Sequence, residues 1–106
     1  MTREEIQNMP AGRDMDDLIR PLVPLINWLY GSCSDPRYAA ELLIEADRHG
    51  WKYLHHNVAV QPERFFVKIQ KERDNSIEYI WEVNATANTF SLACCRAFLM
   101  AWETDK

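Results

Sequence analysis

Glycine is scarce in this chain of 106 residues, which contains only Gly12, Gly31 and Gly50. Phosphate-binding loops need several glycines close together, because the backbone itself must approach the phosphate groups. The three glycines lie far apart in the sequence, so no such loop is present. This absence counts against an ordinary nucleotide-dependent enzyme.

An excess of basic residues is also missing, since the formal net charge is −4. Sequence-independent nucleic-acid binding needs a dense basic patch that displaces counterions from the phosphates. Lysine and arginine are instead scattered along the chain and mixed with acidic residues. We therefore do not expect nucleic acid as a partner.

The longest apolar run, from Leu18 to Tyr30, is shorter than the roughly 20 residues that a membrane-spanning helix needs. Arg20, Pro21 and Pro24 interrupt it. The polar, acidic N-terminus lacks the apolar centre of a signal peptide. We expect a cytoplasmic protein that has no contact with membranes.

The three cysteines, Cys33, Cys94 and Cys95, do not form a disulfide framework, because their number is odd and two are adjacent. Reduced thiols are the expectation for a cytoplasmic protein. A nucleophilic cysteine needs a base and an electropositive setting. Only Arg96 is adjacent to this pair, so we interpret both as core residues and expect no catalytic residue.

No metal or cofactor is expected either. His55 and His56 lie next to each other in a predicted strand, where successive side chains point to opposite faces and cannot chelate one ion. Glu78 and Glu82 share a strand face but lie about 13 Å apart at strand rise. That separation is too large for a carboxylate pair of the glycosidase type.

Capping residues predict where the helices begin and end. Thr2 and Glu5 form a capping box for a helix that ends near Met9, and Asp14 is expected to cap a second, short segment. Ser34 or Asp35, followed by Pro36, is expected to cap a helix that Gly50 ends. A last helix is expected over residues 89–102, with Thr89 as its cap.

Three strands are predicted between the last two helices, at residues 51–60, 64–71 and 77–83, because apolar and polar residues alternate there. The short turns between them predict an antiparallel meander. The expected fold is a single α+β domain over residues 1–106, in which helices sandwich a three-stranded antiparallel sheet.

The last predicted helix is apolar nearly all round, so it must be covered on more than one side. Sheet on one face and either another helix or a second subunit on the other would cover it. We therefore expect a homo-oligomer.

Aromatic residues exceed what one face of a three-stranded sheet can hold, so some are expected at a subunit interface or in a ligand pocket. Aromatic rings can stack on a base while arginine or lysine binds phosphate. The ligand-binding candidates are Trp28 and Trp81 for the base, with Arg37, Lys68 and Arg96 for the phosphate. The alternative interpretation is a core and a dimer contact.

Several segments resemble the phage ABA sandwich domain family. They are the opening residues 1–6, the segment 9–16, Ser34-Asp35, Gly50-Trp51 and the segment 93–97 near the C-terminus. Members of that family look like small phage or prophage proteins in which a sheet lies between helical layers. The resemblance carries no assigned active site. The chain departs from the family pattern at Pro21 and Pro24, and in its aromatic residues before Ser34.

The resemblance implies a phage- or prophage-encoded protein that acts by binding rather than by catalysis. Counter-defence by sequestering a small nucleotide signal is the leading hypothesis. The alternative is an inhibitor or adaptor that binds a host protein, with Trp28-Leu29-Tyr30 as part of the docking surface.

Overall fold

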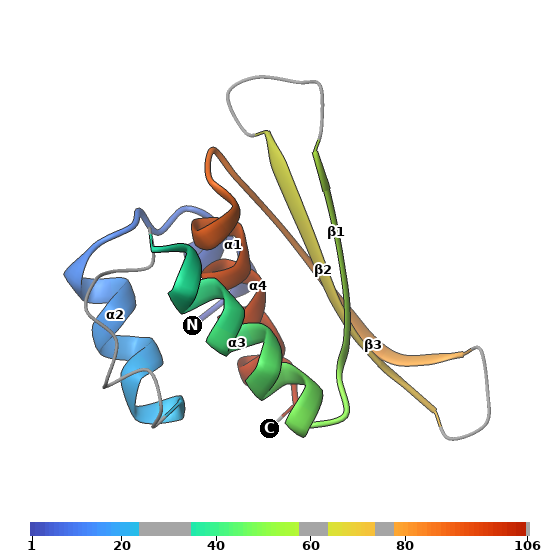
Figure 1. The fold of residues 1–106 in the computed structure, drawn as a ribbon. Helices are drawn as coiled ribbons and strands as arrows, with labels where there is room; N and C mark the ends of the chain where they lie inside the picture. Colours follow the sequence, from blue (N-terminus) through green and yellow to red (C-terminus); the bar gives the residue numbers. More distant parts are fainter. Residues whose placement is uncertain (24–34, 58–63, 74–77, 106) are drawn as a thin grey trace.

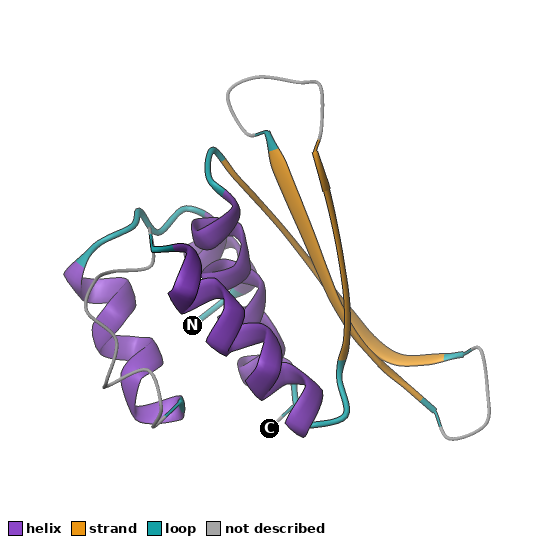
Figure 2. Ribbon diagram, viewed as in Figure 1, coloured by secondary structure: helices purple, strands orange, loops and turns teal. Residues whose placement is uncertain are grey.

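The computed structural model describes residues 1–23, 35–57, 64–73 and 78–105. It has the predicted α+β architecture, in which helices precede a three-stranded antiparallel meander and a last helix packs on the sheet (Figures 1 and 2). The elements in chain order are α1 (Arg3–Gln7), α2 (Arg13–Ile19), the short 3-10 helix η1 (Arg20–Leu22), α3 (Pro36–Arg48), β1 (Lys52–Asn57), β2 (Phe65–Glu72), β3 (Tyr79–Ala87) and α4 (Phe90–Thr104).

Local signals in the sequence set the helix ends. In α1 the Thr2 hydroxyl accepts from the Glu5 amide at 3.1 Å, and the Glu5 carboxylate accepts from the Thr2 amide at 3.0 Å, as predicted. Asp35 caps α3 by accepting from the Arg37 amide at 2.9 Å. After α3 the chain turns at Gly50, whose φ of +77° favours glycine.

The predicted cap of α2 is wrong. The N-cap residue is Gly12 rather than Asp14, and no side chain caps the helix. Gly12 has a φ of +152°, which glycine adopts readily because it has no Cβ, so the helix begins one residue before Asp14. Asp14 then lies in the first turn, where an acidic side chain is still favourable for the helix dipole.

In the sheet β2 lies in the centre, and both of its neighbours run antiparallel to it. Strand β3 extends to Ala87, four residues beyond the predicted end at Val83. Ala85 and Ala87 are buried beneath the helices, whereas small side chains give little strand signal in a sequence. Residues 58–60 of the first predicted strand lie outside the described residues.

Helix α4 crosses the sheet over β2 and β3 and also packs against α1, α2 and α3. Every residue from Ser91 to Ala101 is buried. The sheet and the other helices of the same chain therefore cover the apolar circumference of α4. This helix alone gives no reason to expect a second subunit.

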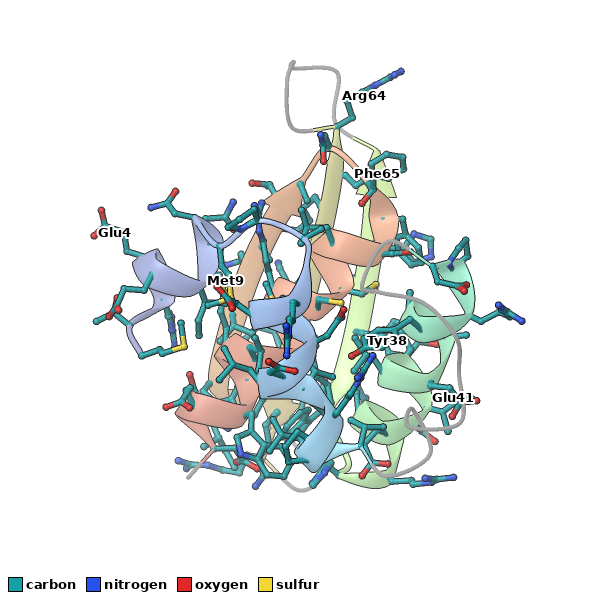
Figure 3. The ribbon with its side chains drawn as sticks, turned by 90° about the vertical axis from the view of Figure 1, so that its left-hand side faces the viewer. Glu4, Met9, Tyr38, Glu41, Arg64 and Phe65 are labelled. Atoms are coloured by element: carbon teal, nitrogen blue, oxygen red, sulfur yellow. The ribbon has the colours of Figure 1, made fainter. Side chains whose placement is uncertain are left out.

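All the described helices lie on one side of the sheet, whereas the predicted sandwich has helices on both sides (Figure 1). Viewed from the helical side, the helices stand in front of the strands, with α1 at Glu4 and α3 at Glu41 on opposite sides of the molecule (Figure 3). The opposite sheet face carries the ion pairs Lys52–Glu72 at 2.8 Å and Lys68–Glu82 at 3.5 Å. Charged pairs of this kind suit a face in contact with solvent. None of the described helices combines the length and apolar character needed to cross a bilayer.

The outer edge of β3 is covered by a side chain of α1. The Gln7 amide donates to the Thr86 carbonyl at 3.0 Å and accepts from the Thr86 amide at 3.2 Å. Gln7 thus makes the two hydrogen bonds that a residue of a fourth strand would make. The Arg96 guanidinium donates to the same carbonyl at 2.7 Å, which ties α1, β3 and α4 together.

We predict that Gln7→Ala lowers the free energy of unfolding by about 1–2 kcal/mol, because Thr86 loses two part-buried hydrogen bonds. Gln7→Glu keeps an acceptor for the Thr86 amide but sets a carboxylate oxygen against the Thr86 carbonyl, so a loss at least as large is expected at neutral pH. Urea unfolding followed by circular dichroism measures both. Equal stability of Gln7→Ala and the wild type would show that this contact does not hold α1 in place.

Candidate functional site

Aromatic rings from three parts of the chain meet where α3 ends, β1 begins and α4 ends. The His49 ring stacks on Trp51 with centroids 4.7 Å apart, and Trp102 meets His49 edge-on at 5.4 Å. Trp81 of β3 meets Trp51 edge-on, also at 5.4 Å, and Phe98 lies 5.7 Å from Trp51. We call these five residues the aromatic cluster. Such edge-on and stacked contacts add to the stabilisation that burial of the rings provides.

Asp105 holds the cluster together from the C-terminal end of α4. Its Oδ1 accepts from the Trp81 indole at 3.0 Å and from Lys71 Nζ at 3.1 Å, and its Oδ2 accepts from the Trp51 indole at 3.2 Å. Partial burial alone would raise the pKa of Asp105. The hydrogen bonds from Trp81, Lys71 and Trp51 outweigh it, so the pKa lies below its ordinary value and the group is ionised at neutral pH.

The local sequence explains how these side chains converge. Trp51 follows the turn at Gly50, and Trp81 is paired with Lys71 in the β2–β3 register. Both therefore lie on the helical side of the sheet, where they can reach Asp105, the C-cap residue of α4. Trp102 lies on the last turn of the same helix, next to the carboxylate.

A pocket of about 200 Å³ opens beside the cluster and is lined by His49, Trp51, Trp102 and Asp105. Pockets for drug-sized ligands are roughly 300–1,000 Å³, so this one fits a single planar ring rather than a whole nucleotide. Its walls are three rings and one carboxylate. Such a lining can stack on a flat ligand and accept a hydrogen bond from it.

The ligand-binding candidates from the sequence are not brought together. Trp81 belongs to the aromatic cluster, although it contacts Asp105 rather than lining the pocket. Arg96 is only 7% exposed, and its guanidinium donates to the Met9 carbonyl at 3.0 and 3.2 Å and to the Thr86 carbonyl. It therefore joins α4 to the N-terminal segment and the sheet.

The remaining candidates lie elsewhere. Lys68 is paired with Glu82 on the sheet face that carries no described helix, so the sheet separates it from Trp81. Arg37 is exposed at the start of α3 and forms an ion pair with Asp35 at 2.9 Å. Trp28, together with the predicted docking segment Trp28-Leu29-Tyr30, lies outside the described residues.

None of the four residues that line the pocket was a ligand-binding candidate from the sequence: His49, Trp51, Trp102 and Asp105. His49, Trp102 and Asp105 each lie in the last turn or at the cap of a helix, where side chains of different elements meet. That position is a signal that can be recognised afterwards. The indole partners of Asp105 give no signal, because they are 24 and 54 residues away in the chain.

The buried thiols do not form a nucleophilic site. Burial raises the pKa of Cys94 to about 12, so its thiolate is scarce at neutral pH. Cys95 is buried as well. Within the described ranges, no three histidine, cysteine or acidic side chains are grouped so that they could hold a metal ion.

No family model, no curated protein and no solved structure matches this chain. The resemblance to the phage ABA sandwich domain family therefore remains a prediction from the residues that carry it.

We predict that Asp105→Asn lowers the free energy of unfolding by about 1–2 kcal/mol at neutral pH, because an amide cannot accept all three donors. The folded pKa of Asp105 is below the ordinary 3.8, so its stabilisation is complete above that value and is lost as the pH falls through the folded pKa.

Thermal unfolding from neutral pH to about pH 2 tests this, and the difference between variant and wild type should shrink towards the acid end. Asp17→Asn, at an exposed carboxylate of α2, is the matched control and should unfold like the wild type. A difference that stays constant down to about pH 2 would contradict a stabilising role of the ionised carboxylate.

Proposed function

We propose that this chain is a non-enzymatic binding protein that sequesters a small nucleotide by its base. The observation that carries the proposal is the aromatic-walled pocket with Asp105 at its edge. In the phage setting that the sequence resemblance implies, the role would be counter-defence, by removal of a nucleotide signal of the host.

The rings of the pocket supply the affinity for a base. Stacking of a base on an aromatic side chain contributes about 1–3 kcal/mol. The volume of about 200 Å³ matches a base better than a base with its sugar and phosphates. The rest of the nucleotide would therefore lie outside the pocket.

Asp105 supplies the selectivity. A carboxylate has about four acceptor positions, and three are used by Trp51, Trp81 and Lys71. The remaining position, on Oδ2, can accept one N–H group of a ligand. Adenine, guanine and cytosine present an amino group, whereas the free N–H of uracil lies between two carbonyls that the carboxylate would repel. The negative charge also disfavours a phosphate inside the pocket.

Of the candidates from the sequence this proposal uses only Trp81, which binds Asp105 without lining the pocket, and it uses none of the phosphate-binding residues. Arg37, Lys68 and Arg96 form the contacts described above, none of which lies at the pocket. The contribution of the phosphate groups to affinity is accordingly expected to be small.

We predict that adenine-, guanine- or cytosine-containing nucleosides and cyclic nucleotides raise the melting temperature, whereas uridine does not. A ligand at 100 times its dissociation constant adds about 2.7 kcal/mol to the stability of the folded state. Thermal shift assays with a panel of nucleosides and nucleotides, followed by calorimetry, measure this effect. An unchanged melting temperature with every compound would overturn the proposal.

Variants locate the site within the same experiment. Trp102→Ala removes one wall of the pocket and should abolish the shift, while Tyr79→Ala removes an exposed ring elsewhere and should preserve it. Lys68→Ala and Arg37→Ala should also preserve it. A shift that survives Trp102→Ala but disappears in Lys68→Ala would place the ligand on the other sheet face.

The alternative proposal is an inhibitor or adaptor that binds a host protein, and one observation favours it. Tyr79 and Ile80, adjacent at the start of β3, are 51% and 55% exposed. Neighbouring large apolar side chains that remain exposed are a feature of protein-binding surfaces.

For this alternative we predict that the double variant Tyr79→Ala, Ile80→Ala loses a host protein that the wild type captures from lysate. Trp102→Ala, which alters the nucleotide pocket, should retain it. Quantitative mass spectrometry of the captured proteins compares the three chains. The same captured set for all three would remove the case for a docking surface at this end of β3.

A further inference from the structure

The two edges of the sheet differ. At the β3 edge Gln7 occupies both backbone groups of Thr86, so a further strand cannot pair at that residue. At the β1 edge none of the described residues pairs with the strand, because β2 is its only neighbour in the sheet. An unpaired edge strand presents backbone donors and acceptors to another chain.

Helix α3 carries a second apolar stripe beside this edge. Its core-facing residues include Tyr38, Leu42 and Ala46, which are fully or almost fully buried. A different stripe, Ala40, Leu43 and Ile44, follows the helical i, i+3, i+4 spacing and lines a groove of about 510 Å³ together with Asp47 and Tyr53.

The apolar side chains of this groove are more exposed than is usual for a helix surface that faces only solvent. Ile44 is 46% exposed and Tyr53, on β1, is 41% exposed. A surface helix normally carries polar residues outside its single core-facing stripe. The groove and the unpaired edge lie side by side, since Tyr53 belongs to both.

We propose that a second copy of this chain pairs its β1 antiparallel to β1 of the first, so that the two sheets become one continuous six-stranded sheet. The two-fold axis stands perpendicular to the sheet. It therefore keeps the helices of both copies on the same side, and it brings the two α3 helices together over the joined strands.

A second copy suits this surface because, in a two-fold symmetric dimer, the same surface of each copy faces the other. Antiparallel α3 helices place the Leu43 and Ile44 stripe against the same stripe of the partner. Along this stripe Arg37, which pairs with Asp35, lies near the start of α3, and Asp47 lies near its end. Reversal of the partner helix brings Arg37 towards the partner's Asp47.

Strand pairing and helix packing are both needed for a stable dimer. A specific interface buries about 800 Å² on each partner, and pairing along a six-residue strand covers only about 20 Å of edge. The α3 groove supplies the apolar area next to that edge. None of the five groove residues lines the nucleotide pocket, so the dimer does not depend on the proposed ligand.

Sedimentation velocity at micromolar concentration tests the dimer. The wild type is expected to sediment as a dimer, and Ile44→Lys as a monomer with an unchanged circular dichroism spectrum. Ile80→Lys is the matched control, since it places the same charge at a similarly exposed isoleucine of β3, and it should remain dimeric. A monomeric wild type at about 100 μM, or a dimer that Ile44→Lys leaves intact, would overturn the proposal.

Crosslinking tests the arrangement within the dimer. In a Cys33→Ser background the thiols of Cys94 and Cys95 are buried, so a cysteine placed at Ile44 is the reactive one. A short bismaleimide should join Ile44→Cys chains into a covalent dimer and leave Ile80→Cys chains as monomers. Crosslinking at position 80 but not at position 44 would place the interface on the other edge of the sheet.

Discussion

Complete burial of α4 is the constraint on which the rest of the structure depends. This helix is apolar nearly all round, and it becomes stable in water only when every side of it is covered. The sheet covers one side, and the other helices cover the rest. Arg96, the charged residue in its centre, is accommodated because backbone carbonyls of Met9 and Thr86 accept its hydrogen bonds.

The same constraint explains why the pocket lies at the C-terminal end of α4. Along most of the helix the sheet and the other helices cover every side, and the polar residues Ser91 and Arg96 are buried. At its last turn the helix meets the start of β1, and Asp105 connects it to Trp51 and Trp81 through hydrogen bonds. The carboxylate thus stabilises the fold and is also the polar group of the pocket. Its loss would therefore affect stability and binding together.

How much of this could be predicted from the sequence depends on the range of each interaction. Thr2, Asp35 and Thr89 cap helices through contacts within three residues, and such contacts are visible in the sequence. The end of β3 was missed because its last inward-facing residues are alanines. The placement of all described helices on one side of the sheet was missed because the alternation within a strand does not reveal which face helices cover. Asp105 was missed because its indole partners are distant in the chain. The candidate cations do not lie at the pocket, because ion pairs with Asp35 and Glu82 and backbone carbonyls engage them elsewhere.

The proposed dimer forms at strand β1, and the proposed pocket lies beside the start of that strand, so the two can influence each other. Trp51 directly precedes β1, so pairing of that strand with a second copy restricts the backbone that carries one wall of the pocket. A wall that is already fixed costs less conformational entropy when a base stacks on it. By reciprocity, a base that binds the pocket favours the dimer by the same factor. The size of that coupling depends on how far the start of β1 moves in the monomer. If pairing with β2 and the hydrogen bond between Trp51 and Asp105 already hold this segment firmly, dimer formation can restrict it little further.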